Sequence, residues 1–220
     1  MNSVRLWYKK SGLVIYTSHL DMNRCFTRAV RRAGIPLWYT EGFNPHPYIT
    51  FLLPLPLGQG GEREPIDIRL EKEIPFEEIK NRLNSVLPEG LEIVDVTEAV
   101  NKVHLITHAR YLIEIGFEND GEAEGFAAGA QSVVDSGILN AQKRSKRGIN
   151  TVNLCEFVDS FSALNDGAAV RIDTVLATGT QKNLNAGLLI DALCGEFGAE
   201  AEKISILRKE IYMDNKIIFE

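Results

Sequence analysis

The sequence predicts an α+β fold of two tandem ferredoxin-like halves, each a split βαβ unit with an antiparallel sheet. In the first half, short runs with a period of two and longer runs with three-and-four spacing follow in the order strand, helix, strand, strand, helix, strand. A similar order returns in the second half. We therefore expect an N-terminal domain at residues 1–100 and a C-terminal domain at residues 108–220.

Periodicity and the Gly and Pro residues between the runs define the elements of the first half. Ser18 caps the first helix, an apolar stripe with three-and-four spacing follows it, and Gly34 ends it. The second helix starts at Pro75 and ends at a Pro-Glu-Gly turn. The expected elements are extended segments at 4–8 and 13–16, a helix at 18–33, strands at 48–53 and 66–70 joined by a loop at 54–65, a helix at 75–87 and a strand at 91–96.

The second half follows the first less closely, and residues 157–170 fit no clear pattern. A linker near residues 99–109 joins the two halves. The expected elements are a strand at 111–117, a helix at 123–134, a hairpin of 138–142 with 151–157, a strand at 170–176, a helix at 186–197 and a strand at 202–211.

Composition is that of an ordinary soluble globular protein, with 45% hydrophobic and 25% charged residues in a chain of 220. No apolar run reaches the length of a membrane span and the first residues lack an apolar signal core, so we expect a cytoplasmic protein with no membrane partner. The formal net charge is −6. Nucleic-acid binding must therefore depend on local basic clusters.

Two basic clusters stand out. One lies on a single arc of the first helix, and no acidic residue occurs between Asn23 and Thr40 to neutralise it. The other lies at the tip of the expected hairpin. Such clusters occur on solvated helix faces, but four cations in three turns of an acidic protein favour an anionic partner, either RNA or an acidic protein. The two clusters are Arg24, Arg28, Arg31 and Arg32, and Lys143, Arg144, Lys146 and Arg147.

The loop at residues 41–47 combines one glycine with two prolines, which restrict the backbone and remove two amide donors. Such a loop holds Phe43, Asn44 and His46 in defined positions. These side chains suit the stacking and hydrogen bonding of an RNA base, or docking to a protein. The alternative is a rigid crossover in which Phe43 fills the core.

His19 lies at the amino end of the first helix, where Ser18 and Asp21 fit a capping box. A cap does not require an imidazole, and a neutral His19 could accept a proton from a ribose hydroxyl near pH 7. His19 is therefore a weak candidate for the base of a metal-independent ribonuclease. The structural interpretation of Ser18 and Asp21 as a cap is preferred.

We expect no metal and no cofactor. Cys25, Cys155 and Cys194 are far apart and are interpreted as small buried apolar residues. His104 and His108 lie four apart in a segment interpreted as extended or linker, and no third ligand is evident nearby. The Gly-rich stretch at 58–61 lacks the Lys-Ser/Thr ending of a phosphate-binding loop.

Four motifs follow one another in order: Ser18-His19-Leu20-Asp21 and the segments 28–36, 41–47 and 53–58. In these motifs the chain resembles the radical SAM-linked (radical SAM-associated) bacterial protein family, a domain of unknown function. The resemblance covers about the first hundred residues and is weaker at 144–154. Members occur beside or fused to radical-SAM proteins and, in some cases, attached to an RNase E/G-type ribonuclease.

The resemblance implies a radical-SAM protein as a partner, or a place in an RNA-related pathway, and it supplies no catalytic residue. This chain lacks the closely spaced cysteine triad of radical-SAM enzymes, so it is at most the accessory component. It departs from the family at Asn183-Leu184-Asn185, where relatives tend to place an Arg-Pro pair before the last helix. We assign this segment no role.

These observations lead to three hypotheses. The preferred one is an accessory protein that binds RNA, transfer or ribosomal, without catalysis of its own. The second is an interaction adaptor for a radical-SAM enzyme. The third is the metal-independent ribonuclease that uses His19.

Overall fold

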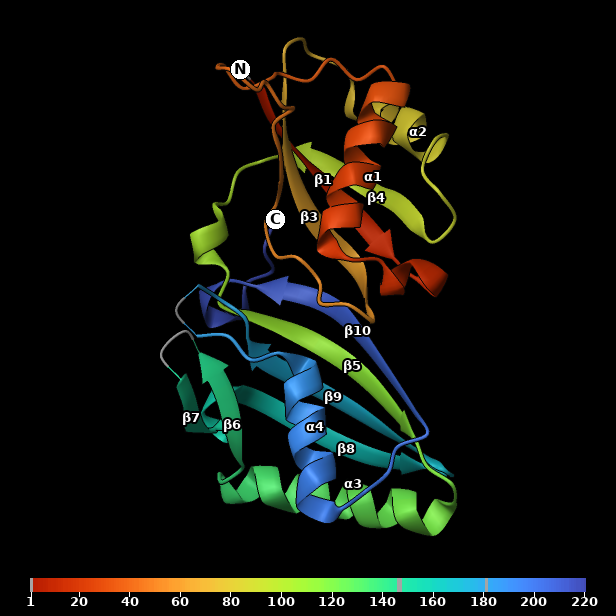
Figure 1. Cartoon of the computed structure of the whole chain (residues 1–220), viewed down its shortest axis with the longest axis vertical. Coiled ribbons are helices and arrows are strands. Elements are labelled where there is room, and N and C mark those ends of the chain that lie inside the picture. The colour runs from red at the N-terminus through yellow and green to blue at the C-terminus, as the bar shows by residue number, and fades with distance from the viewer. Residues whose placement is uncertain (1, 146–147, 181) are drawn as a thin grey trace. The chain divides into compact units, whose positions relative to one another are not determined.

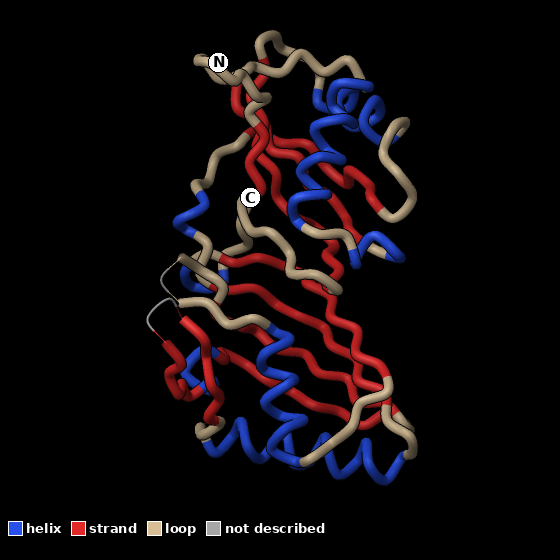
Figure 2. Tube along the Cα trace, viewed as in Figure 1, coloured by secondary structure: helices blue, strands red, loops and turns tan. Residues whose placement is uncertain are grey.

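The computed structural model describes residues 2–145, 148–180 and 182–220 (Figures 1 and 2). The chain divides into a first unit, Met1–Val103 with Glu220, and a second unit, His104–Phe219. The described residues form a mixed α+β fold with four α-helices and antiparallel strand pairing within each unit. In the described part of the chain no helix is long and apolar enough to cross a membrane.

The first unit has a sheet in which β4 pairs with β1, β1 with β3, and β3 with β2, all antiparallel. On β1, Leu6 is aligned with Val96 of β4 on one side and with Ile66 of β3 on the other. The elements are β1 (Asn2–Lys10), a 3-10 helix (Gly12–Tyr16), α1 (His19–Arg32), β2 (Ile49–Phe51), β3 (Gln59–Leu70), α2 (Phe76–Asn84) and β4 (Leu91–Glu98).

The core of the first unit lies between this sheet and the helices α1 and α2 (Figure 1). Alternate residues of the strands face the helices, because successive side chains of a strand point to opposite faces. Phe26 of α1 is fully buried, and its ring meets those of Tyr8 and Phe51 edge to face at centroid distances of 5.2 and 5.6 Å. Such aromatic contacts stabilise a core beyond the area that they bury.

Two expectations for the first unit are wrong. Residues 13–16 form a 3-10 helix, closed by a 3.0 Å bond from the Thr17 amide to the Val14 carbonyl, and are not extended. The strand expected at 66–70 begins at Gln59, inside the expected loop. This longer strand pairs with β1 well beyond the expected start: Trp7 is aligned with Pro65 and, after a shift of register, Lys10 with Gly61.

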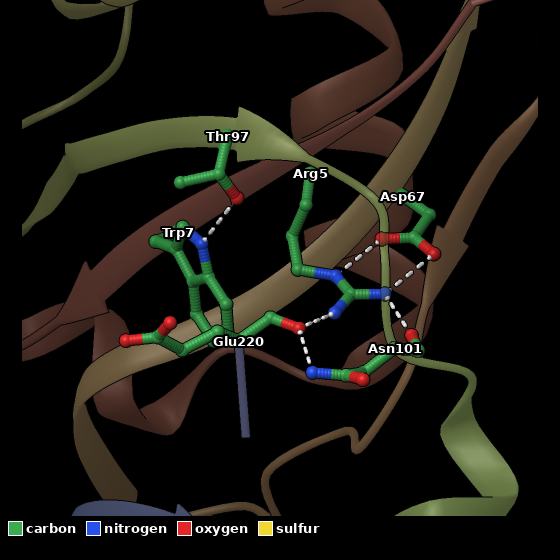
Figure 3. Close-up of polar contacts among 6 residues, drawn as sticks. All are labelled: Arg5, Trp7, Asp67, Thr97, Asn101 and Glu220. Atoms are coloured by element: carbon green, nitrogen blue, oxygen red, sulfur yellow. Dashed lines mark hydrogen bonds and ion pairs between the residues drawn. The ribbon is translucent and has the colours of Figure 1, made fainter. Parts of the chain in front are cut away.

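A buried polar network joins the strands of the first unit to Glu220 (Figure 3). The fully buried Arg5 of β1 donates from Nε and Nη2 to the Asp67 carboxylate of β3 at 2.7 and 3.1 Å. Its Nη1 donates to the backbone oxygen of Glu220 at 2.8 Å, and its Nη2 also donates to that of Asn101 at 2.7 Å. Nearby, Trp7 donates to the Thr97 hydroxyl at 3.0 Å.

The second unit has a sheet in the order β10-β5-β9-β8 and a separate two-stranded sheet of β6 and β7. Helix α3 packs against β8 and β9. The elements are a 3-10 helix at the junction (Val103–Leu105), β5 (His108–Gly116), α3 (Asp120–Ser136), β6 (Asn140–Ser145), β7 (Gly148–Asn153), a 3-10 helix (Leu154–Phe157), β8 (Val158–Asp166), β9 (Ala169–Ala177), α4 (Ala186–Phe197), β10 (Lys203–Tyr212) and a 3-10 turn (Asp214–Lys216).

The unassigned stretch at 157–170 contains β8, an edge strand of this sheet. None of its residues is fully buried, so the apolar alternation that marks a half-buried strand is weak. Its pairing with β9, in which Ala163 is aligned with Ile172, defines it instead. A local signal does end it: the Asn165 side chain donates to the Gly167 carbonyl at 2.9 Å.

Tyr212 gives the second unit a stability contribution that depends on pH. Burial, and then the hydrogen bond that the phenol donates to Glu210, raise the pKa of Tyr212 to about 12. Folding favours the neutral phenol, so its contribution is complete below the unfolded pKa of about 10 and is lost as pH rises through about 12.

We expect Tyr212→Phe to lose less stability than the wild type between about pH 10 and 12, because this variant has no phenol to ionise. Urea unfolding at a series of alkaline pH values measures the difference. An ultraviolet titration of phenolate in the folded protein should also lose one late step in the variant. Identical pH dependence of the two proteins would contradict the assignment.

Candidate nucleic-acid interface

The amino end of α1 is closed by Ser18, whose hydroxyl accepts from the Asp21 amide at 3.2 Å and donates to the Asp21 carboxylate at 2.8 Å. In a capping box the Asp21 carboxylate would accept from the Ser18 amide. Here it accepts from the Ser18 hydroxyl instead. These bonds, and then Arg24, hold the pKa of Asp21 below its usual value. The role of Ser18 and Asp21 here is to start the helix.

The two faces of α1 carry different chemistry. Met22, Phe26, Ala29 and Val30 are buried in the core, while the four arginines are exposed on the opposite face. The arginines line one shallow depression with a volume of about 650 Å³. We call it the arginine depression, and its lining residues are Asp21, Arg24, Cys25, Arg28, Arg31, Arg32 and Pro88.

Contacts from outside the helix hold two of these arginines. Arg31 Nε donates to the Tyr39 hydroxyl at 3.2 Å, and the Arg31 guanidinium lies 5.8 Å from the centre of that ring. Arg32 donates to the carbonyl of Val86, which follows α2. Neither contact involves a carboxylate, so both arginines keep their positive charge uncompensated by these partners.

Arg24 differs from the other three. It pairs with Asp21 at 3.2 Å, so the expectation that the whole cluster lacks a neighbouring carboxylate is wrong at this position. Both side chains of the pair are more than half exposed, so solvent screens the pair and it contributes little to stability. Within the described residues the Arg28 side chain forms no hydrogen bond or ion pair. Arg28 is therefore the cation most open to a ligand.

The three cysteines, which we expected to be buried, are only partly so: Cys25, Cys155 and Cys194 each remain partly exposed. Partial burial still raises the pKa of all three thiols. For Cys25, the arginines Arg32 and Arg28 oppose that rise. In the described part of the chain no group of three or more His, Cys, Asp and Glu side chains could hold a metal ion.

The loop at 41–47 is closed by hydrogen bonds across its base. Thr40 donates its amide to the His46 carbonyl at 2.9 Å, and the His46 amide donates to the Thr40 hydroxyl at 3.1 Å. The His46 Nδ1 lies 3.1 Å from that hydroxyl and 3.2 Å from the Asn44 carbonyl oxygen. Gly42 has a φ of +128°, which side-chain-bearing residues rarely adopt. The loop therefore has a defined shape.

Phe43 is fully exposed at the tip of this loop, and Asn44 and His46 are exposed beside it. The alternative in which Phe43 fills the core is thus wrong. The loop is connected to the arginine depression, because Tyr39, which binds Arg31, forms an isolated bridge with Pro47 at the base of the loop. The structure places Phe43, Asn44, His46 and the four arginines in the same unit.

Sequence reasoning missed a stacked group next to the loop. The Arg69 guanidinium of β3 lies 4.1 Å from the ring centre of Tyr48 and 5.5 Å from that of Trp38, and all three side chains are partly exposed. The signal in the sequence was the presence of aromatic residues on both flanks of the loop. Tertiary pairing brings Trp38 close to Arg69: Leu37 is aligned with Leu70, and the Trp38 amide donates to the Arg69 carbonyl at 2.9 Å.

His19 is exposed, and its ring meets Phe51 of β2 edge to face at a centroid distance of 5.1 Å. Within the described residues the imidazole has no hydrogen-bonded partner that would orient it. General bases are usually oriented by such a partner. This placement favours a packing role for His19.

The second basic cluster belongs to the second unit. The backbones of Lys143 and Arg144 lie in β6 and are aligned with Asn150 and Ile149 of β7. Lys146 and Arg147 lie outside the described residues. The expected hairpin thus has its strands at 140–145 and 148–153.

The segment that departs from the resembled family has structural contacts. Asn183 forms an isolated bridge with Thr178, and Leu184 is buried. Asn185 caps α4 by accepting from the Gly187 amide at 2.9 Å. These contacts show that all three residues have a structural role at the start of α4.

Comparison with known proteins identifies the family to which this chain belongs. A family model described as "Uncharacterized protein conserved in bacteria (DUF2344)" matches residues 3–186. No curated protein matches the sequence. Among solved structures, an unknown protein from Galdieria sulphuraria is 12% identical, with 94% of this chain and 98% of that chain covered. Its TM-score of 0.28 is too low to support an argument.

Proposed function

This chain belongs to the bacterial family DUF2344, and from that premise we propose that it is an accessory protein that binds RNA, transfer or ribosomal, without catalysis of its own. The observation that carries the proposal is the arginine depression on α1. It concentrates four guanidinium groups on one face of a protein whose net charge is −6. Phosphate attraction in such a protein must be local.

The arginines suit phosphate oxygens in both chemistry and geometry. A guanidinium is planar and always charged, and it binds phosphate with two parallel hydrogen bonds. Tyr39 and Val86 already restrain Arg31 and Arg32, so less side-chain entropy is lost when a ligand binds. Arg28, between them on the same face, supplies donors that no described residue uses. The depression therefore offers a prepared site for the RNA backbone.

The loop at 41–47 supplies what phosphate contacts lack, which is a contact to bases. Unpaired RNA bases stack on exposed aromatic rings. Phe43 is such a ring, held at the tip of a loop whose base is closed by Thr40 and His46. Asn44 and His46 offer hydrogen bonds to a base edge beside it.

We also propose the finer fold assignment and the partner expected from the sequence. Both units follow the order strand, helix, strand, strand, helix, strand, with β6 and β7 inserted in the second, which supports two tandem ferredoxin-like halves at 1–100 and 108–220. The resemblance to radical SAM-linked proteins supports a radical-SAM protein as the partner. Lys143, Arg144, Lys146 and Arg147 are proposed as further phosphate contacts.

Replacing Arg28 and Arg31 together by glutamate is expected to weaken RNA binding on the order of a hundredfold at low salt, because two attractive charges become repulsive to phosphate. The slope of log affinity against log salt concentration should fall by roughly 0.7 for each RNA phosphate that the variant no longer neutralises. Filter binding of bulk transfer RNA across a salt series measures both quantities.

The matched control changes the same type of residue outside the depression. Arg171 of β9 is exposed and paired with Asp166, and Arg171→Glu should leave RNA affinity within about threefold of the wild type. If the variant with both glutamates binds as tightly as this control, the proposal is wrong.

One observation also favours the adaptor hypothesis, namely the complete exposure of Phe43. A lone exposed aromatic ring is a common anchor in protein interfaces. If the protein is an adaptor, capture of a purified radical-SAM partner should survive nuclease treatment and be lost in Phe43→Ala. Capture that nuclease abolishes would favour the RNA-binding function instead.

A further inference from the structure

The second unit contains a groove between the end of α4 and the first turns of α3, with a volume of about 740 Å³. We call it the α3–α4 groove; Figure 1 shows the two helices meeting in this unit. Phe117, Phe126 and Phe197 give it an apolar floor, and the rings of Phe126 and Phe197 meet edge to face at 5.9 Å. Phe197 remains 39% exposed.

The rim of the groove is acidic on both sides. Glu118 and Glu122 lie on the α3 side, and Glu200 and Glu202 on the segment that leads to β10. All four are exposed, and within the described residues none forms an ion pair. No lysine, arginine or histidine of the described chain lines the groove. The rim therefore repels anions, including RNA, and attracts cations.

Helix α3 exposes bare backbone in the groove at Gly121 and Gly125, which are four residues apart and so share a face. A glycine inside a helix destabilises the helix relative to alanine. At Gly129 the fold explains this cost, since an added Cβ would lie 2.8 Å from the Phe197 ring. At Gly125 no atom beyond the neighbouring residues and backbone of its own helix lies within 4 Å of such a Cβ. The open space there lets another molecule approach the helix closely.

We propose that the α3–α4 groove binds a basic amphipathic helix of a protein partner. An apolar side chain of that helix lies over Gly125 against the phenylalanine floor, and its lysines or arginines meet the glutamates of the rim. Helix-in-groove recognition has this combination of an apolar anchor and charged flanks. The site lies in the second unit and does not depend on the proposed binding of RNA.

The test uses the full-length protein and a fluorescent synthetic helix with lysines on one face and leucines on the other. Fluorescence anisotropy should show that Gly125→Leu weakens binding at least about tenfold, because the new side chain fills the groove. Removing a helical glycine favours folding, so thermal unfolding of this variant should be no lower than that of the wild type.

The matched control is Ala128→Leu, on an exposed position of α3 outside the groove, which should bind the peptide as the wild type does. The double variant Glu122→Gln with Glu200→Gln should bind more weakly and with less dependence on salt. A peptide with serines in place of the leucines should bind about tenfold more weakly to the wild type.

Three results would overturn the proposal. The first is equal binding by Gly125→Leu and Ala128→Leu. The second is equal binding of the serine and leucine peptides, which would indicate charge attraction alone. The third is a dimer of the wild type, seen by sedimentation without peptide and absent in Gly125→Leu, which would assign the groove to a second copy of the chain.

Discussion

Asp67→Asn is expected to lower the free energy of unfolding of the first unit by about 3–5 kcal/mol. Arg5 is fully buried, and two of its donors bind the Asp67 carboxylate at 2.7 and 3.1 Å. An asparagine of the same size removes the carboxylate charge that these two donors bind. The other acceptors of the guanidinium include backbone oxygens of Asn101 and Glu220 (Figure 3).

Urea unfolding followed by tryptophan fluorescence measures this change, because both tryptophans of the chain, Trp7 and Trp38, lie in the first unit. The control is Asp166→Asn, which breaks the pair with Arg171 in which both side chains are more than half exposed. That variant should change stability by no more than about 1 kcal/mol. Equal effects of the two substitutions would show that burial does not strengthen the Arg5 pair.

Phe26→Ala is expected to cost about 3–5 kcal/mol of unfolding free energy, because it opens a cavity in the centre of the first core. The ring is fully buried and meets two other rings edge to face. The same substitution loosens the helix that presents the arginines. RNA affinity should therefore fall together with stability, although Phe26 faces away from the arginine depression.

The same helix offers a control at Leu20, which is 60% exposed. Leu20→Ala should change stability by no more than about 0.5 kcal/mol and leave RNA affinity unchanged. Fluorescence-detected unfolding and filter binding of each variant give both quantities. A loss at Leu20 as large as that at Phe26 would show that exposed and buried positions of α1 contribute alike.

Local patterns were enough to predict helix α1 and its two faces. The cap at Ser18 and the three-and-four spacing of Met22 and Phe26 are properties of neighbouring residues, so they are readable in one sequence. The same spacing puts the arginines on one face. The exposed edge strand β8 could not be predicted in this way, because its residues are scarcely buried and its pairing with β9 defines it.

For the candidate site, too, one part could be predicted from the sequence and the other part required the tertiary structure. Periodicity alone determined that four arginines share an arc of α1 and that a glycine- and proline-rich loop follows. Only tertiary structure decided that Tyr39 holds Arg31, that Val86 holds Arg32 and that the ring of Phe43 points into solvent. The physical reason is the separation along the sequence of the residues that interact. Helix periodicity depends on residues within a turn or two, whereas these contacts join residues up to 54 positions apart.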